Sequence, residues 1–284
     1  MWYNIRGREG KEAIPYDTKE SEGKNPMNIM VFDTETTSLE KPFCYNIGYV
    51  IFDTERREVI AKRDFVVEQV WHNSMLFTTA YYADKRDLYV GRMKARKCLM
   101  DKFGYITQKM YRDIVDFEIT DAYAYNSPFD VKVFAYNCEW FKCINPFDNV
   151  AVHDIRGYVH KCIAWKEDYQ TFCDEHSEFT ESGNYSTTAE SVFRFLSNDT
   201  EWNEEHTALA DSEIECAILC ECIERGCEWN KDYKVYRSIT KNEVKQFEII
   251  DCNGNSYLFD YTSKRHFNND NGLRFTVKRK EVEG

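Results

Sequence analysis

Near its N-terminal end, the chain has a short apolar stretch that is followed at once by two closely spaced acids. Residues 28–32, Asn-Ile-Met-Val-Phe, form an apolar run typical of a buried strand, and Asp33 and Glu35 follow it directly. Side chains two positions apart on a strand point to the same side of the sheet. Burying two like charges costs free energy unless a cation neutralises them. Either these acids lie in a solvent-exposed turn, or they hold a divalent cation such as Mg²⁺ or Mn²⁺, for which carboxylate oxygens are suitable ligands.

The runs that follow this strand predict a mixed α/β sheet. Residues 45–52 and 59–67 are apolar and rich in β-branched side chains, which predicts an antiparallel meander with the first strand. Strands and helices then alternate, as they do in sheets that are flanked by helices. Further strands are expected at 122–125 and 149–153, and helices at 84–115, 129–141, 155–163, 187–196 and 207–225. The acidic segment 167–181 is expected to form a loop.

Composition and charge narrow the class of protein. The chain has 284 residues, of which 43% are hydrophobic and 30% are charged, as in a folded globular protein and unlike a disordered one. The net charge of −12 argues against a protein that coats nucleic acid by bulk electrostatic attraction. This charge is compatible with an enzyme that holds one end of a nucleic acid through metal ions.

The sequence also predicts where the protein is located and whether its cysteines are reduced. No stretch approaches the ~20 apolar residues that a membrane span needs, and residues 1–26 lack the apolar core of a secretory signal. We expect residues 1–26 to form an N-terminal arm or tail, and the protein to be cytoplasmic with no membrane partner. The 11 cysteines include no CxxC pair and are expected to be reduced thiols. A zinc site at the cysteines between residues 216 and 227 is disfavoured, because structural zinc usually uses closely paired ligands on turns.

Two distant segments carry the residue types that a metal site at the first strand requires. Asp130 ends the segment Tyr-Asn-Ser-Pro-Phe-Asp after a short strand, and His206 precedes Asp211 by five residues at the start of the long helix. In this order the D-x-E-T-T, N-x-x-F-D and H-x-A-x-x-D motifs resemble those of the DEDD superfamily of 3′–5′ exonucleases, in its histidine-bearing DEDDh branch. That branch includes polymerase proofreading exonucleases, ribonuclease T and oligoribonuclease. The resemblance covers residues 27–228.

The resemblance implies an RNase H-like fold and a role for individual residues. Four acids occupy the places of the residues that bind two Mg²⁺ or Mn²⁺ ions: Asp33, Glu35, Asp130 and Asp211. His206 occupies the place of the general base, for which imidazole is suited because its usual pKa of ~6.5 lets it accept a proton near neutral pH. Contacts with the terminal nucleotide are expected from Thr36, Thr37, Leu39, Asn126 and Phe129. Phe129 fits a core position equally well, and Asn126 fits the cap of a turn.

The reaction implied by the resemblance is metal-dependent hydrolysis of the terminal phosphodiester at the 3′ end of single-stranded nucleic acid, which releases nucleoside 5′-monophosphates. DNA is slightly preferred over RNA because the chain carries an additional domain. No residue identifies a contact with the 2′-hydroxyl group, which would distinguish the two. An RNA-trimming or short-oligonucleotide nuclease is the alternative. The intact acids and histidine disfavour a non-catalytic nucleic-acid-binding or regulatory protein on the same fold.

The character of the chain changes near residue 231. Residues 231–284 contain 11 Lys and Arg against 8 Asp and Glu, a net charge of +3. Asn253-Gly254 is a strong hairpin signal between strands expected at 247–251 and 257–261, and another strand is expected at 273–278. We therefore expect an exonuclease domain over residues 27–230 and a small β appendage over residues 231–284. The appendage is the expected contact for a polymerase or another protein partner.

Overall fold

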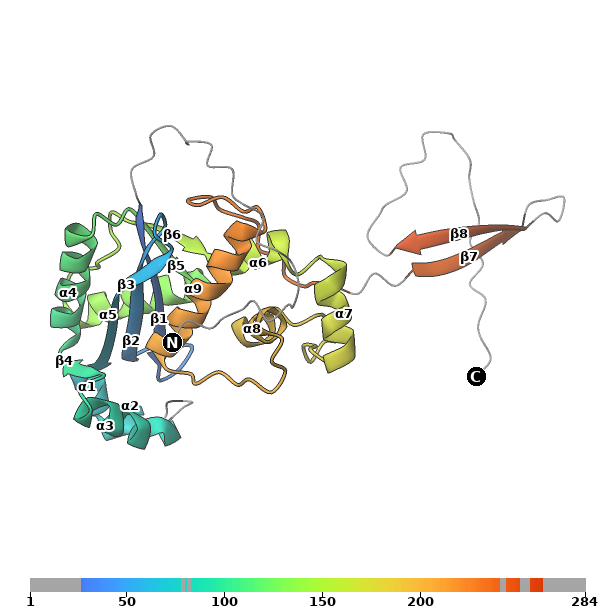
Figure 1. Cartoon of the computed structure of the whole chain (residues 1–284). Coiled ribbons are helices and arrows are strands. Elements are labelled where there is room, and N and C mark those ends of the chain that lie inside the picture. The colour runs from blue at the N-terminus through green and yellow to red at the C-terminus, as the bar shows by residue number, and fades with distance from the viewer. Residues whose placement is uncertain (1–26, 78–79, 81–82, 241–243, 251–255, 263–284) are drawn as a thin grey trace. The chain divides into compact units, whose positions relative to one another are not determined.

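The computed structural model describes residues 27–77, 80, 83–240, 244–250 and 256–262 (Figure 1). Two compact units follow one another along the chain, and the division falls between Ile239 and Thr240. The strands are β1 (Asn28–Thr36), β2 (Cys44–Asp53), β3 (Glu58–Val67), β4 (Leu99–Asp101), β5 (Asp121–Ala124), β6 (Ala151–Asp154), β7 (Val244–Ile250) and β8 (Ser256–Thr262). The α-helices are α1 (Glu68–Trp71), α2 (Ser74–Phe77), α3 (Arg86–Lys94), α4 (Phe103–Asp116), α5 (Ser127–Phe141), α6 (Ile155–Cys162), α7 (Glu167–His176), α8 (Ala189–Ser197) and α9 (Ala208–Glu224), and η1 (Ala83–Lys85) is a 3₁₀ turn.

Within the described residues, the first unit contains one six-stranded mixed sheet in the order β4-β3-β2-β1-β5-β6. The strands β1, β2 and β3 form the predicted antiparallel meander. The strands β5 and β6 continue the sheet parallel to β1, and β4 adds a parallel strand to the outer edge of β3. Helices cover both faces of this sheet (Figure 1). The RNase H-like α/β fold expected from the sequence is therefore confirmed.

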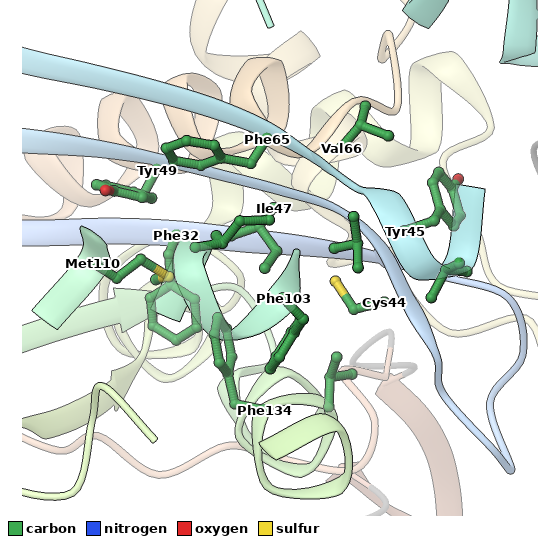
Figure 2. Close-up of a cluster of buried hydrophobic side chains, with 14 of the residues drawn as sticks. Phe32, Cys44, Tyr45, Ile47, Tyr49, Phe65, Val66, Phe103, Met110 and Phe134 are labelled. Atoms are coloured by element: carbon green, nitrogen blue, oxygen red, sulfur yellow. The ribbon is translucent and has the colours of Figure 1, made fainter. Parts of the chain in front are cut away.

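One face of the sheet packs against α4 and α5. Alternate residues of β1 supply its apolar side chains, and Phe32 stacks on Phe147 with 4.4 Å between ring centroids. Figure 2 shows Phe32 together with Phe103 of α4 and Phe134 of α5 in this buried cluster. The alternation places the neighbouring residues of β1, Ile29 and Val31, on the opposite face.

The opposite face packs against α6, α8 and α9, and α9 crosses the central strands (Figure 1). Ile29 and Val31 belong to the core on this side, which includes Ile218 of α9. Asp33 and Glu35 continue the same alternation along β1. The polar end of β1 therefore faces the N-terminal part of α9.

Two predictions about local structure are wrong. The helix expected at 84–115 is interrupted: a residue in the left-handed region, Arg96 (φ 56°), follows α3, and β4 then pairs with the free edge of β3. The acidic segment expected to form a loop contains helix α7, because its apolar side chains, Tyr169, Phe172 and Cys173, recur at helical spacing and are buried.

The second unit contains a two-stranded antiparallel sheet, β7 and β8. The two strands expected at 247–251 and 257–261 thus pair as predicted. The turn residues Asn253-Gly254, the strand expected at 273–278 and the expected N-terminal arm lie outside the described residues. The division between the units lies later in the chain than the boundary expected at residue 231, and Ile239 is still paired with Tyr185 of the first unit.

Two further findings concern the described ranges only. Their cysteines are free thiols, and most of them are buried. None of the helices in these ranges combines the length and apolar character that crossing a membrane requires.

Candidate active site

Three of the predicted metal ligands meet at the end of β1. Asp33 and Glu35 of β1 and Asp211 of α9 each offer a carboxylate oxygen, and these oxygens lie within 4.8 Å of one another. Hydrogen bonds between α9 and β2 hold the helix in this place. The backbone N–H of Ala208 donates to Oδ1 of Asn46 at 2.8 Å, and the hydroxyl of Ser212 donates to the carbonyl oxygen of Gly48 at 3.0 Å.

The fourth predicted ligand, Asp130, lies in the first turn of α5 and is 3% exposed. Its Oδ1 accepts a hydrogen bond from the hydroxyl of Thr34 at 2.6 Å. Asp130 is outside the group formed by the other three acids, but its negative charge is the largest charge effect that raises the pKa of Asp33. Asp130 is therefore connected to the other three acids by its hydrogen bond with Thr34, which lies between Asp33 and Glu35 on β1.

His206 lies in the loop before α9, in the left-handed backbone region with φ 51°. One ring nitrogen of His206, a carboxylate oxygen of Glu204 and one of Asp211 lie within 4.8 Å of one another. Nδ1 of His206 is 3.4 Å from Oε2 of Glu204. Burial, and then the charge of Lys85, lower the pKa of His206 below its usual value, so the neutral imidazole is favoured.

Burial and mutual repulsion dominate the electrostatics of the acids. Burial raises the pKa of Glu35 to about 7 and that of Asp130 to about 7. Burial, followed by the charge of Glu204, raises the pKa of Asp211 to about 9. The pKa of Asp33 is raised well above its usual value, by burial and then by the charges of the neighbouring acids. Without a cation, the surroundings of these carboxyl groups therefore favour their protonated, neutral form.

The donor set fits a divalent metal ion. Among the described residues, Oδ1 of Asp211 is a buried side-chain oxygen without a hydrogen-bond partner, on a residue that is 6% exposed. A buried carboxylate oxygen without a partner is costly, and a metal ion bound there would satisfy it. Asp33, Glu35 and Asp211 offer oxygen ligands, which Mg²⁺ and Mn²⁺ prefer. Asp130 extends the same set from α5.

Two further acids belong to this site and were not predicted. Glu215 is 3% exposed, and its Oε2 accepts the backbone N–H of Tyr125 at 3.2 Å. Burial and the charges of Asp130 and Asp211 raise its pKa well above the usual value. Burial likewise raises the pKa of Glu204 to about 7. The four-residue spacing of Asp211 and Glu215 on one helix face was the available sequence signal for Glu215.

Tyr45 and Lys85 also reach the site without having been predicted. The hydroxyl of Tyr45 donates to Oε2 of Glu35 at 3.4 Å. Lys85, from η1, is the cation whose charge lowers the pKa of Glu35 and of Asp211 against the effect of burial. Neither residue belongs to a recognisable motif.

The residues predicted to contact the terminal nucleotide have varied surroundings. Thr36 ends β1, and the buried Thr37 donates its backbone N–H to Phe43 at 2.9 Å. Leu39 is 74% exposed. Asn126 is the N-cap residue of α5 with φ 62°, and its backbone N–H donates to Asp154 at 2.9 Å. Phe129 is partly buried and packs against the core on the α4 and α5 face. A contact of these residues with substrate stays a prediction.

Comparisons with known proteins give matches among solved structures. No family model and no curated protein matches the sequence. E. coli exonuclease I, in complex with a dA16 oligonucleotide, is 14% identical with a TM-score of 0.45, over 70% of this chain and 41% of that chain. The nuclease domain of 3′hExo, a DEDDh family member bound to rAMP, is 13% identical with a TM-score of 0.45, over 75% and 98%. A full-length 3′-exonuclease is 14% identical with a TM-score of 0.47, over 85% and 69%.

The chain thus spans about 41% of the length of exonuclease I. With identities of 13–14% and TM-scores of 0.45–0.47, these matches are distant likenesses.

Proposed function

We propose that the chain is a metal-dependent 3′–5′ exonuclease that hydrolyses terminal phosphodiesters of single-stranded nucleic acid. The observation that carries the proposal is the convergence of Asp33, Glu35 and Asp211, with His206 beside Asp211. The orphaned oxygen of Asp211 supports a cation at this point. The products are nucleoside 5′-monophosphates.

Each side chain has a role in this proposal. Asp33, Glu35, Asp130 and Asp211 would hold two Mg²⁺ or Mn²⁺ ions. Bound divalent ions supply positive charge to the phosphate oxygens and acidify a bound water. His206 accepts a proton from the attacking water, whose oxygen forms the new bond to phosphorus as the bond to the 3′-oxygen breaks. The 3′-oxygen leaves with the shortened strand and takes up a proton from solvent water to become its new 3′-hydroxyl. The lowered pKa of His206 keeps its imidazole neutral and able to accept that proton.

The charge distribution favours binding at one end of the substrate. The chain has a net charge of −12, and acids line the site, so long-range attraction for a phosphate backbone is weak. Metal ions and a 3′-terminal nucleotide then supply the main interactions. We retain DNA as the slightly preferred substrate and RNA as the alternative.

The deciding experiment uses 5′-labelled single-stranded DNA and RNA of one sequence. The purified protein is incubated with Mg²⁺, with Mn²⁺ or with a chelator, beside the Asp33→Ala variant. A metal-dependent ladder that shortens from the 3′ end, and is absent in the variant, is the expected result. The strand that is cleaved at the higher rate, DNA or RNA, identifies the preferred sugar. Cleavage of equal rate by the variant, or no cleavage of either strand by the wild type, contradicts the proposal.

A further inference from the structure

The segment between β3 and β4 contacts the loop that carries His206. Lys85 donates through Nζ to the backbone carbonyl oxygen of Glu205 and, at 3.5 Å, to that of His206. Seven residues later, Nη1 of Arg92 donates to the carboxylate of Glu205 at 2.9 Å. Two side chains at helical spacing therefore hold the same short loop.

A third side chain of this segment reaches the end of that loop indirectly. The hydroxyl of Tyr89, which is fully buried, donates to Oδ1 of Asn46 at 2.9 Å. The same oxygen accepts the backbone N–H of Ala208, the first residue of α9, at 2.8 Å. One helix face thus lies against the His206 loop, and it carries Lys85, Tyr89 and Arg92 at spacings of four and three residues.

Contacts other than those of Lys85 fix this segment on β3 and on the short helices α1 and α2. The guanidinium of Arg92 donates to Asp64 at 2.8 and 3.1 Å. The guanidinium of Arg86 lies 5.0 Å from the ring centroid of Trp71 and 5.3 Å from that of Phe77. Because these contacts do not involve Lys85, replacement of Lys85 removes one ammonium group and leaves the segment anchored by Arg86 and Arg92.

The position of Lys85 also matters for charge. Its ammonium group donates to the left-handed backbone of His206, whose ring nitrogen lies within 4.8 Å of carboxylate oxygens of Glu204 and Asp211. In keeping with this placement, the charge of Lys85 lowers the pKa of Glu204 and Asp211 against the effect of burial. The left-handed conformation is sterically disfavoured for residues other than glycine, so this backbone needs support from its surroundings. Hydrogen bonds from one ammonium to two successive carbonyl oxygens stabilise such a backbone.

We propose that Lys85 is a positioning residue of the active site: it holds the backbone of His206 in the orientation that the general base needs, and it keeps a fixed positive charge beside the metal-binding acids. This inference rests on the proposed function. It predicts two opposite effects of removing the ammonium group. Turnover falls because His206 is no longer held, while divalent ions bind more tightly because a competing cation has gone.

The test compares Lys85→Met and Lys85→Arg with a matched control, Lys94→Met, at an exposed lysine of α3. At saturating Mg²⁺, Lys85→Met is expected to lower kcat by about tenfold, part of the 10²–10⁴-fold contribution of a positioned base, with KM little changed. Lys85→Arg, which retains charge and donors, recovers most of kcat. Calorimetric titration without substrate is expected to give Lys85→Met a Kd for Mn²⁺ about fivefold lower than wild type. The control matches the wild type in both measurements.

A wild-type kcat in Lys85→Met overturns the inference, as does a rise in KM without a fall in kcat, which indicates direct substrate binding. An unchanged Kd for Mn²⁺ also overturns it, because the charge is then not beside the ligands. Melting curves identify a folding defect, and in that case the Lys85→Arg variant decides: a loss of kcat in well-folded Lys85→Arg contradicts the inference. If the wild type cleaves neither DNA nor RNA, the proposed function fails, whereas the Mn²⁺ titration still tests the placement of Lys85.

Discussion

Gly48 of β2 pairs with Asp33 of β1, and the first turn of α9 packs directly on Gly48. A Cβ atom at Gly48 would lie 2.0 Å from the backbone nitrogen of Leu209 and 2.4 Å from the carbonyl oxygen of Ala208. The missing side chain lets the helix approach the strand that carries the acids. Asp211, on the same turn of α9, is thereby brought to Asp33 and Glu35.

Replacement of Gly48 should therefore damage both stability and the site. In Gly48→Ala, the added methyl group collides with backbone that cannot move independently of α9, and we expect a loss of about 3 kcal/mol in the free energy of unfolding. Denaturant unfolding measures this loss, and nuclease assays should show reduced turnover. Gly91→Ala is the control: a Cβ there meets nothing within 4 Å, and alanine in α3 should raise stability by up to ~1 kcal/mol. Wild-type stability of Gly48→Ala would contradict the close approach.

The acids should make the metal-free protein less stable as pH rises. The pKa of Asp211 is about 9 in the folded chain against an ordinary value of 3.8, so between these values the folded state binds a proton that the unfolded state has released. Unfolding free energy therefore decreases with increasing pH in this range. Asp211→Asn removes the contribution of Asp211 to this pH dependence and leaves that of the other buried acids, such as Glu35 and Asp130, whose pKa values are also raised.

Melting temperatures in the presence of a chelator test this pH dependence. At pH 8 we expect Asp211→Asn to melt above the wild type, and the difference should shrink toward pH 4. Adding Mg²⁺ should stabilise the wild type more than the variant, since only the wild type retains the full ligand set. Identical melting curves of the two proteins at pH 8 would show that ionisation of Asp211 does not destabilise the metal-free protein.

The rate of hydrolysis should depend on the protonation of His206. Its pKa lies below the usual value because of burial and the charge of Lys85, and the protonated ring cannot accept a proton. The rate is therefore expected to fall as pH decreases through a value under ~6.5. Profiles of kcat/KM at saturating Mg²⁺ measure this limb. His206→Ala should be slower by orders of magnitude and lack the limb; an unchanged profile in that variant would assign the titration to another group.

Glu204 should assist His206 as the imidazole takes up its proton. Its Oε2 lies 3.4 Å from Nδ1, where a negative charge stabilises the imidazolium ion. In Glu204→Gln an acceptor remains but the charge is lost, and we expect kcat to fall by about tenfold. Glu201→Gln, at an exposed residue earlier in the same loop, serves as the control. Equal kcat values for Glu204→Gln and Glu201→Gln would show that the charge of Glu204 does not assist the reaction.

Much of the candidate site was predictable because it is encoded locally. Asp33 and Glu35 lie two residues apart at the end of an apolar strand, and this alternation places them on one face whatever surrounds them. The start of α9 after His206 is likewise a local pattern. Glu215 lies among other acids of α9, and its four-residue spacing from Asp211 is a weak signal by itself. Its burial and the hydrogen bond from the backbone N–H of Tyr125 distinguish it from a solvated residue.

The sequence by itself determined the alternation of the strands, the positions of most helices and the acids at the end of β1. These features depend on the periodicity of neighbouring residues. The formation of β4 depended on tertiary structure, since it pairs with the free edge of β3. Helix α7 has apolar side chains at helical spacing, and their burial against the core outweighs the acidic character of the segment. Tertiary structure also decided that Lys85 contacts the His206 loop across 121 positions of sequence. Such a contact depends on how two distant segments pack on one sheet, and no local pattern encodes that packing.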